Sequence, residues 1–328
     1  TDKKKIILPD SAHGTNPASV ILAGFEVVEI KSNDKGLVDI DDLRAHVDEN
    51  TAGFMLTNPN TLGLFETQVE EIAEIVHSVD GLMYMDGANF NAILGIIKPG
   101  EMGFDIMHYN LHKTFATPHG GGGPGSGPIG VRKDLVKFLP IPMIDKKDDK
   151  YFLDYNHEDT SFGKVHSFFG NFAVNFRAYI YIKMLGAKGL RRISENAVIN
   201  ANYIQKKLEK YYDIPFKDQY CMHEFVASGT WQKDKYGINT LDIAKRILDK
   251  GYHAPTIYFP LIVPEAMMIE PTETESMETL DDFINAMIEI AKECEETPDL
   301  LKNAPLNTPV KRVDDTLAVR QLNVKFDW

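Results

Sequence analysis

The sequence predicts an α/β protein with a mostly parallel sheet in a large first domain, followed by a smaller α+β domain. Three observations support this prediction. Short apolar runs alternate with helix-like segments over residues 1–135, an order typical of parallel sheets covered by helices. Turn-forming clusters follow several of the apolar runs. From residue 213 onward, short strand-like and helical segments mix without this order.

Five strands are expected in the first domain, each at a short apolar run. Their predicted ranges are residues 4–8, 25–30, 53–57, 82–85 and 105–111. Helices are expected between them, because apolar residues recur at helical spacing over 69–76 and acids open the segment 39–49. Pro17 suits the first position of the first helix, and Asn16 before it is the expected N-cap.

Two further helices are expected to lead out of the large domain. Residues 170–185 are strongly apolar and aromatic, and residues 187–212 have an amphipathic pattern that suits a linking helix. The stretch 137–159, rich in Pro, Asp and Lys, is interpreted as an excursion from the sheet. The expected organisation is a large domain at 1–186, the linking helix, and a small α+β domain at 213–328.

The composition fits a globular protein and excludes several classes. Of the 328 residues, 43% are hydrophobic and 25% charged, and the formal net charge is −13. An acidic chain argues against binding to nucleic acids or anionic membranes, which select basic surfaces. Cys221 and Cys294 are too few for a disulfide framework and favour a reducing compartment, the cytoplasm. No apolar run approaches the roughly 20 residues of a membrane span.

Four polar residues each lie just past a predicted strand end. They are His13, Asn58, Asp86 and Lys113. In open parallel sheets, ligands bind at the carboxyl ends of the strands. We therefore expect these residues to form one site.

Lys113 and Asp86 together indicate pyridoxal phosphate (PLP) chemistry. A lysine amine forms a Schiff base with a carbonyl, and PLP is such a carbonyl. An aspartate at the end of a preceding strand would keep the pyridine nitrogen protonated, so that the ring accepts electrons. Ala88 is small enough for a flat ring to rest on. The plainer alternatives are a solvated surface lysine and an aspartate that caps a turn.

Three other side chains are candidates around the same cofactor. Asn58 shapes an Asn-Pro turn and is expected to hydrogen-bond the phenolate oxygen of the cofactor as well. His13 could stack on the pyridine ring, although a single histidine is more often structural. His112, beside the lysine, could contact the cofactor phosphate or the substrate carboxylate. No His or Cys spacing matches a metal site.

A glycine-dense loop follows Lys113 at residues 119–128. Its backbone N–H groups could bind an anion, but it lacks the Gly-x-x-x-x-Gly-Lys-Ser/Thr pattern of a nucleotide P-loop. The plainer alternative is a mobile surface loop. So many glycines beside the lysine favour the close approach of a long ligand arm. The expected channel residues are His119, Gly120, Gly121, Gly122 and Gly123.

Four segments carry a resemblance to a known family. They are Asp10-Ser-Ala-His-Gly-Thr-Asn-Pro-Ala-Ser19, Thr57-Asn-Pro-Asn-Thr-Leu-Gly63, Asp86-Gly-Ala-Asn89, and Asn110-Leu-His-Lys-Thr-Phe115 with the glycine loop through Val131. Together they resemble glycine decarboxylase, the P-protein of the glycine cleavage system. The chain is similar to the C-terminal portion of the second subunit of its two-subunit form. The last segment is very specific, and the resemblance covers most of the chain.

The resemblance implies PLP-dependent fold type I, the aminotransferase-like fold, with PLP as the cofactor. It makes Lys113 the Schiff-base lysine, Asp86 the partner of the pyridine nitrogen and His13 the residue that stacks on the ring. It departs at the front, where the family carries a long segment that supplies most of the phosphate cup. The large domain is therefore expected to be N-terminally incomplete, with that segment and the companion subunit 1 completing the site.

The implied reaction is the decarboxylation of glycine, with transfer of the aminomethyl group to the lipoyl arm of H-protein. The implied enzyme is glycine dehydrogenase (aminomethyl-transferring), a homo- or hetero-oligomer. Two alternatives remain open: another PLP-dependent decarboxylase or lyase, and a catalytically silent fragment that only associates with partners. A local basic patch at Lys146, Lys147 and Lys150 is the expected docking surface for H-protein. Neither Arg312 nor Arg320 has a motif that marks it as the carboxylate-binding residue.

Overall fold

The computed structural model describes residues 2–121, 123, 125–165 and 170–325. The chain divides into two compact units, the first comprising Thr1–Ile199 with Cys221–His223 and the second Asn200–Tyr220 with Glu224–Trp328. Each unit has its own sheet. The division falls inside a long helix. The domain boundaries expected at 186/187 and 212/213 therefore stay a prediction.

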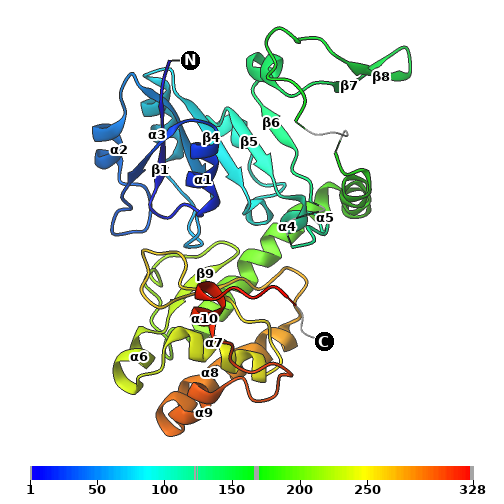
Figure 1. Cartoon of the computed structure of the whole chain (residues 1–328). Coiled ribbons are helices and arrows are strands. Elements are labelled where there is room, and N and C mark those ends of the chain that lie inside the picture. The colour runs from blue at the N-terminus through cyan, green and yellow to red at the C-terminus, as the bar shows by residue number, and fades with distance from the viewer. Residues whose placement is uncertain (1, 122, 124, 166–169, 326–328) are drawn as a thin grey trace. The chain divides into compact units, whose positions relative to one another are not determined.

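The first unit is built on a six-stranded sheet with the order β2-β1-β3-β4-β5-β6 (Figure 1). The strands are β1 (Lys5–Pro9), β2 (Glu26–Ile30), β3 (Thr51–Thr57), β4 (Leu82–Gly87), β5 (Ile106–Tyr109) and β6 (Ile129–Val131). The first five are mutually parallel, and β6 pairs with β5 in the antiparallel direction. The predicted mostly parallel sheet is confirmed.

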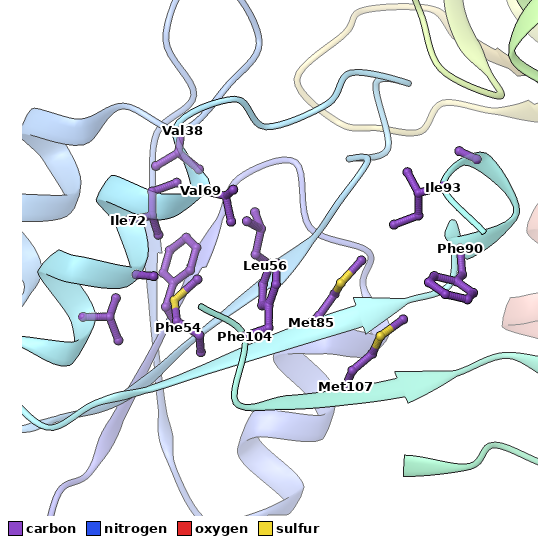
Figure 2. Packing of buried hydrophobic residues seen from close by; sticks show 14 of the residues in the cluster. Val38, Phe54, Leu56, Val69, Ile72, Met85, Phe90, Ile93, Phe104 and Met107 are labelled. Carbon is purple, nitrogen blue, oxygen red and sulfur yellow. The ribbon is translucent and has the colours of Figure 1, made fainter. Parts of the chain in front are cut away.

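Side chains alternate between the two faces of this sheet, as strand geometry requires. On one face, Phe54 and Met85 pack with α2 (Ile40–His46) and α3 (Val69–His77) in the main core. Figure 2 shows Val69 and Ile72 of α3 directed toward the strand residues. On the other face, a smaller cluster joins the strands to α1 (Thr15–Leu22), and Tyr84 packs against it. Tyr84 and Asp86 therefore belong to the α1 face.

The start of α1 differs from the prediction. The N-cap is Gly14, and Asn16 lies inside the first turn, so the expected Asn16 cap is wrong. The side-chain amide of Asn16 instead donates to Asp86 and to Thr57. Inside the first turn the Asn16 side chain cannot cap the helix, and its N–H donor instead satisfies two buried acceptors. The second helix does follow its cap signal, because Asp39 accepts from the backbone N–H groups of residues 41 and 42.

The rest of the first unit consists of short elements, a hairpin and part of a long helix. Its short elements are η1 (Phe90–Ala92), η2 (Pro99–Met102), α4 (Leu111–Thr114), η3 (Lys133–Phe138) and the hairpin β7 (Met143–Lys147) and β8 (Lys150–Asp154). The excursion expected at 137–159 thus contains an antiparallel hairpin. The long helix α5 (Phe172–Leu208) is broken at Gly186, whose φ is 61°. That break separates the two helices that were predicted.

The second unit contains a three-stranded antiparallel sheet with the order β10-β11-β9. Its elements after α5 are β9 (Phe225–Ser228), α6 (Thr230–Tyr236), α7 (Thr240–Asp249), β10 (Thr256–Ile257), β11 (Ala266–Ile269), α8 (Met277–Glu296), α9 (Pro298–Asn303) and α10 (Asp315–Arg320). This is the predicted α+β mixture. In the part of the chain that the structure describes, no helix is both long and apolar enough to cross a membrane.

Candidate active site

The site lies along one edge of the six-stranded sheet. Strands β1, β3, β4 and β5 run in the same direction, so their carboxyl ends meet at this edge. Hydrogen bonds join the loops that follow them. The Thr61 hydroxyl donates to the Ser11 carbonyl at 2.6 Å, and the Asn89 amide donates to the Pro59 carbonyl at 3.0 Å. The loops after β1, β3 and β4 therefore form one connected surface.

Asp86 is the most completely hydrogen-bonded group of the site. It is 4% exposed at the end of β4. Its Oδ1 accepts from Ala88 N at 2.9 Å and from His108 Nε2 at 3.0 Å. Its Oδ2 accepts from Asn16 Nδ2 and Thr57 Oγ1, both at 3.1 Å. Burial raises the pKa of Asp86, but the bond and charge of His108 and the other donors outweigh it and lower the pKa to about 2. Asp86 is therefore an anion at neutral pH.

Strand register brings the partners of Asp86 together. Thr57 pairs with Asp86 across β3 and β4, and Asp86 pairs with His108 across β4 and β5. Gly87 allows this close approach, because a Cβ there would lie 2.0 Å from the His108 carbonyl oxygen. Any larger residue at position 87 would force β4 and β5 apart.

Lys113 lies on α4, directly after β5. Its backbone N–H donates to the Asn110 carbonyl at 3.1 Å, which holds the short helical turn. Its side chain is exposed. Across the described ranges, no hydrogen bond or ion pair engages the Lys113 amine. The amine is therefore available to a carbonyl ligand.

Three buried polar atoms around Lys113 have no hydrogen-bond partner within the described structure: His112 Nδ1, Thr114 Oγ1 and Thr117 Oγ1. Thr114 and Thr117 are 2% and 7% exposed. The His112 ring packs edge-on against His119 at 4.7 Å between centroids. Burial lowers the pKa of His112, and the charges of His119 and Lys113 lower it further. Buried polar groups without partners are rare in folded chains and indicate a ligand or water at this place.

Asn58, His13 and Ala88 lie where the sequence predicted, at the ends of their strands. Asn58 Oδ1 accepts from Glu66 N at 3.0 Å and its Nδ2 donates to the Glu66 carbonyl at 3.4 Å, so the turn role is observed. A bond from Asn58 to a cofactor phenolate stays a prediction. His13 is exposed, and its Nδ1 accepts from Thr15 N. Its stacking role, and that of Ala88 beneath a ring, also stay predictions.

Residues 125–128 of the glycine loop line a cavity of about 1050 Å³, but none of the described channel residues His119, Gly120, Gly121 and Gly123 belongs to its wall. Gly120, Gly121 and Gly123 have φ values of 60°, 67° and 145°, which glycine adopts without strain. Gly122 lies outside the described residues. The cavity wall combines residues 125–129 of the loop with residues 139–144 and the start of α5. The loop thus has both the conformations that require glycine and a space beside it.

The predicted docking patch lies on the β7–β8 hairpin. Residues 145–150 read Asp-Lys-Lys-Asp-Asp-Lys, and Lys146 forms an ion pair with Asp149 at 2.7 Å. The three lysines are therefore balanced by three aspartates. Arg312, in the second unit, donates to Asp242 at 2.6 Å and to the carbonyls of Leu301 and Ala304. These contacts give Arg312 a structural role.

Sequence reasoning missed His108, Thr57, Asn16, Thr114 and Thr117 as site residues. Thr114 and Thr117 could have been suspected, because they flank the predicted lysine. His108 also had a signal, since it precedes Lys113 at the end of the same strand. Nothing in the sequence gives the register that brings His108 and Thr57 to Asp86.

The residues present fit PLP. They offer an anionic carboxylate, an amine without a partner and orphaned polar atoms beside that amine. All four lone-pair directions of Asp86 are already used, so a pyridinium N–H, if it bonds Asp86 as predicted, would replace one donor or share its oxygen. Asn16 is the donor best able to give way, because its amide also lies 3.4 Å from Thr57 Oγ1.

The aminotransferase class-V family model matches residues 1–221, more than half of the chain. The chain belongs to the class-V aminotransferase family. Members of this family are PLP-dependent, which confirms the predicted cofactor and fold class. A second model, described as glycine dehydrogenase, C-terminal domain, matches residues 193–309.

Curated relatives of this class-V chain bear the name "Probable glycine dehydrogenase (decarboxylating) subunit 2". The protein from Listeria innocua is 61% identical over 326 residues, and that from Caldanaerobacter subterraneus subsp. tengcongensis is 60% identical over 324. Both alignments cover 99% of this chain and 66% of the relative, so the chain spans about two thirds of their length. The resemblance predicted from the motifs is confirmed.

Solved structures of low identity share the class-V fold. A glycine decarboxylase (P-protein) of the glycine cleavage system, in inhibitor-bound form, has a TM-score of 0.72 at 19% identity, covering 88% of this chain and 66% of that one. Glutamate decarboxylase of Lactobacillus brevis has a TM-score of 0.68 at 16% identity, covering 90% and 67%. These likenesses establish the fold.

Proposed function

We propose that this chain is the part of a glycine dehydrogenase (decarboxylating) subunit 2 that holds the reacting centre. With PLP, it would decarboxylate glycine and transfer the aminomethyl group to the lipoyl arm of H-protein. The names of its relatives support this reaction. The observation that carries the proposal is the pairing of a buried anionic Asp86 at the end of β4 with a Lys113 amine after β5 that has no partner in the described chain.

Lys113 supplies the amine that tethers the cofactor by its carbonyl carbon. Glycine takes the place of this amine when it binds. PLP, when bound, supplies an electron sink that stabilises the carbanion left by departing carbon dioxide. The displaced amine of Lys113 then stays beside the reacting carbon, where it can accept or deliver a proton.

Asp86 is proposed to stabilise a positive charge on the pyridine nitrogen of the cofactor. Because its pKa is lowered to about 2, it remains ionised and favours a protonated pyridine nitrogen. A charge-assisted hydrogen bond of this kind is stronger than one between neutral groups. His13, from the loop after β1, is proposed to lie against the ring face, with Ala88 leaving room on the Asp86 side.

His112 and the two threonines of the α4 segment are proposed to bind an anion. The unpartnered His112 Nδ1 and the hydroxyls of Thr114 and Thr117 can donate to the cofactor phosphate or to the glycine carboxylate. The lowered pKa of His112 keeps its ring neutral, with one donor and one acceptor nitrogen. Arg312 is unsuited to this task because its guanidinium is engaged in the second unit.

The cavity beside the glycine loop is proposed to admit the lipoyl arm. In the transfer, the aminomethyl carbon bonds to one lipoyl sulfur while the S–S bond breaks. The disulfide is thereby reduced as the glycine carbon is oxidised, and carbon dioxide leaves. The partners would be H-protein and the companion subunit 1, which the name "subunit 2" of the relatives implies. We place this reaction in the cytoplasm, where the free thiols of Cys221 and Cys294 stay reduced.

The decisive test traps the cofactor on the full-length protein mixed with its companion subunit. Borohydride reduction in the presence of PLP, followed by peptide mass mapping, should find the adduct on Lys113. Lys113→Ala should remove the visible absorption band and reduce glycine–bicarbonate exchange by at least about a thousandfold. Lys133→Ala, at an exposed lysine on η3, is the matched control and should change neither.

Other outcomes would support the rival functions. Trapping on a different lysine would contradict the assignment of Lys113. Equal decarboxylation of glycine with and without H-protein would indicate a carrier-independent decarboxylase. A protein that binds subunit 1 but forms no adduct on any lysine would be a silent partner.

A further inference from the structure

His108 bridges two groups of β4 on the face of the sheet that α1 covers. Its Nε2 lies 3.0 Å from Asp86 Oδ1, and its Nδ1 lies 2.9 Å from the Tyr84 hydroxyl oxygen. The Tyr84 and His108 ring centroids are 5.7 Å apart. Tyr84 and Asp86 are two residues apart on one strand and so point to the same face. The three side chains therefore form a continuous chain of hydrogen bonds.

The partners of the ring determine its tautomer. His108 Nε2 faces the Asp86 carboxylate and, at 3.1 Å, the Oδ1 of Asn110. Both are acceptors, so Nε2 must carry a hydrogen. In the neutral ring Nδ1 then accepts the Tyr84 hydroxyl hydrogen. Tyr84 thus donates to His108, and His108 donates to Asp86.

We propose that His108 is a positioning residue of the reaction, which holds the Asp86 carboxylate ionised and oriented toward the cofactor nitrogen, while Tyr84 fixes the tautomer of His108. This inference rests on the proposed function, because it is there that Asp86 is assigned to the cofactor nitrogen. Tyr84 and His108 themselves touch neither the cofactor nor the substrate in this scheme. They act through Asp86.

The electrostatics agree with this direction of donation. Burial and the charge of Asp86 raise the pKa of Tyr84 to about 12, so the phenol keeps its hydrogen. The hydrogen bond from His108 is the largest contribution that lowers the pKa of Asp86. Tyr84 and Asp86, both from β4, are the titratable groups that hydrogen-bond the ring among the residues described. Neutral Asn110 is its third polar contact.

His108 is one of four donors to the buried Asp86. The His108 side chain is 24% exposed, so water can reach part of the ring. If it is removed, Asp86 keeps three donors, from Ala88, Asn16 and Thr57. Loss of this donor should also lower the stability of the cofactor-free protein, so the effect on cofactor binding has to be measured separately from the melting temperature.

The test measures the dissociation constant of PLP, the pH dependence of its visible band and the melting temperature without PLP, on the full-length protein with its companion subunit. His108→Leu removes the donor and should weaken PLP binding by about tenfold or more. His108→Gln can still donate an N–H to Asp86 and should recover most of that loss. Tyr84→Phe should fall between them. His46→Gln is the matched control, because His46 also pairs with an aspartate, Asp42, but on α2.

Each result separates the inference from the proposed function. Equal PLP affinity and an unchanged band in His108→Leu would overturn the positioning role. The positioning role would also be overturned if His108→Leu lost PLP affinity together with melting temperature and His108→Gln recovered neither. If the wild-type protein forms no PLP adduct on Lys113, the proposed function fails instead, and the positioning role fails with it.

Discussion

The two ends of the candidate site, Asp86 on β4 and the α4 segment, differ in how far their polar groups are hydrogen-bonded. At the β4 end, Asp86 receives four hydrogen bonds from α1, β3, β5 and its own turn. At the α4 end, His112 Nδ1 and the Thr114 and Thr117 hydroxyls lack partners in the described structure. The sheet therefore forms the first end without any ligand, because parallel pairing sets the distances. The second end has polar groups that only a ligand or water can satisfy.

The largest expected effect on this comparison comes from neutralising Asp86 at the β4 end, which is hydrogen-bonded without any ligand and is called the prebuilt end. Asp86→Asn should lower glycine–bicarbonate exchange by about a hundredfold to a thousandfold, since it removes a charge aimed at the reacting system. Steady-state exchange with PLP in excess measures this change. Asp145→Asn, at an exposed aspartate of β7, is the control and should exchange glycine at the wild-type rate. Full activity in Asp86→Asn would show that the prebuilt end does not act on the cofactor.

The second effect is a dependence of stability on pH. The pKa of Asp86 is lowered from 3.8 to about 2 in the folded chain, so its contribution is complete above about pH 4 and is lost as the pH falls toward 2. The contribution is roughly 2 kcal/mol. Denaturant unfolding of the wild type and of Asp86→Asn between pH 6 and pH 2 should show it, with the wild type alone losing this part.

A constant stability difference between the two proteins over that pH range would contradict the assignment. It would mean that Asp86 binds its proton equally in the folded and unfolded states.

The smallest effect compares matched threonines at the two ends. Thr57→Val removes a donor from Asp86 and should lower the free energy of unfolding by roughly 1–2 kcal/mol without PLP. Thr114→Val should leave it unchanged or raise it, because this hydroxyl has no partner to lose among the described groups. With PLP present, Thr114→Val should weaken cofactor binding. If Thr57→Val and Thr114→Val lowered the free energy of unfolding equally without PLP, the β4 and α4 ends would not differ in hydrogen bonding as described.

The strand ends could be predicted because apolar runs stop abruptly at polar residues. Asp86 and Lys113 were found in this way, and in the structure Asp86 is the last but one residue of β4 while Lys113 lies on α4, directly after β5. The partners of Asp86 could not be found, because they depend on register and on a helix start. Asn16 shows the difficulty: its type and its place before Pro17 suit an N-cap, yet the helix begins one residue earlier and the Asn16 amide donates to the buried Asp86.

The kink in α5 was also accessible from the sequence. Residues 170–185 and 187–212 were predicted as separate helices, and Gly186 between them has a left-handed φ of 61°. The boundary between the two compact units could not be predicted from the sequence. It falls within the second of these helices and depends on contacts between distant residues.

The four bonds of Asp86 have a consequence for the heat of cofactor association. Because the carboxylate is already solvated by the protein, a ring nitrogen that joins it exchanges one donor for another, and little enthalpy is released there. In the proposed complex, the α4 segment, where His112 and two threonines would gain partners, should then release more heat than the Asp86 end. In that complex the aspartate would fix orientation and charge, while the threonines and His112 would determine how strongly binding weakens as the temperature rises.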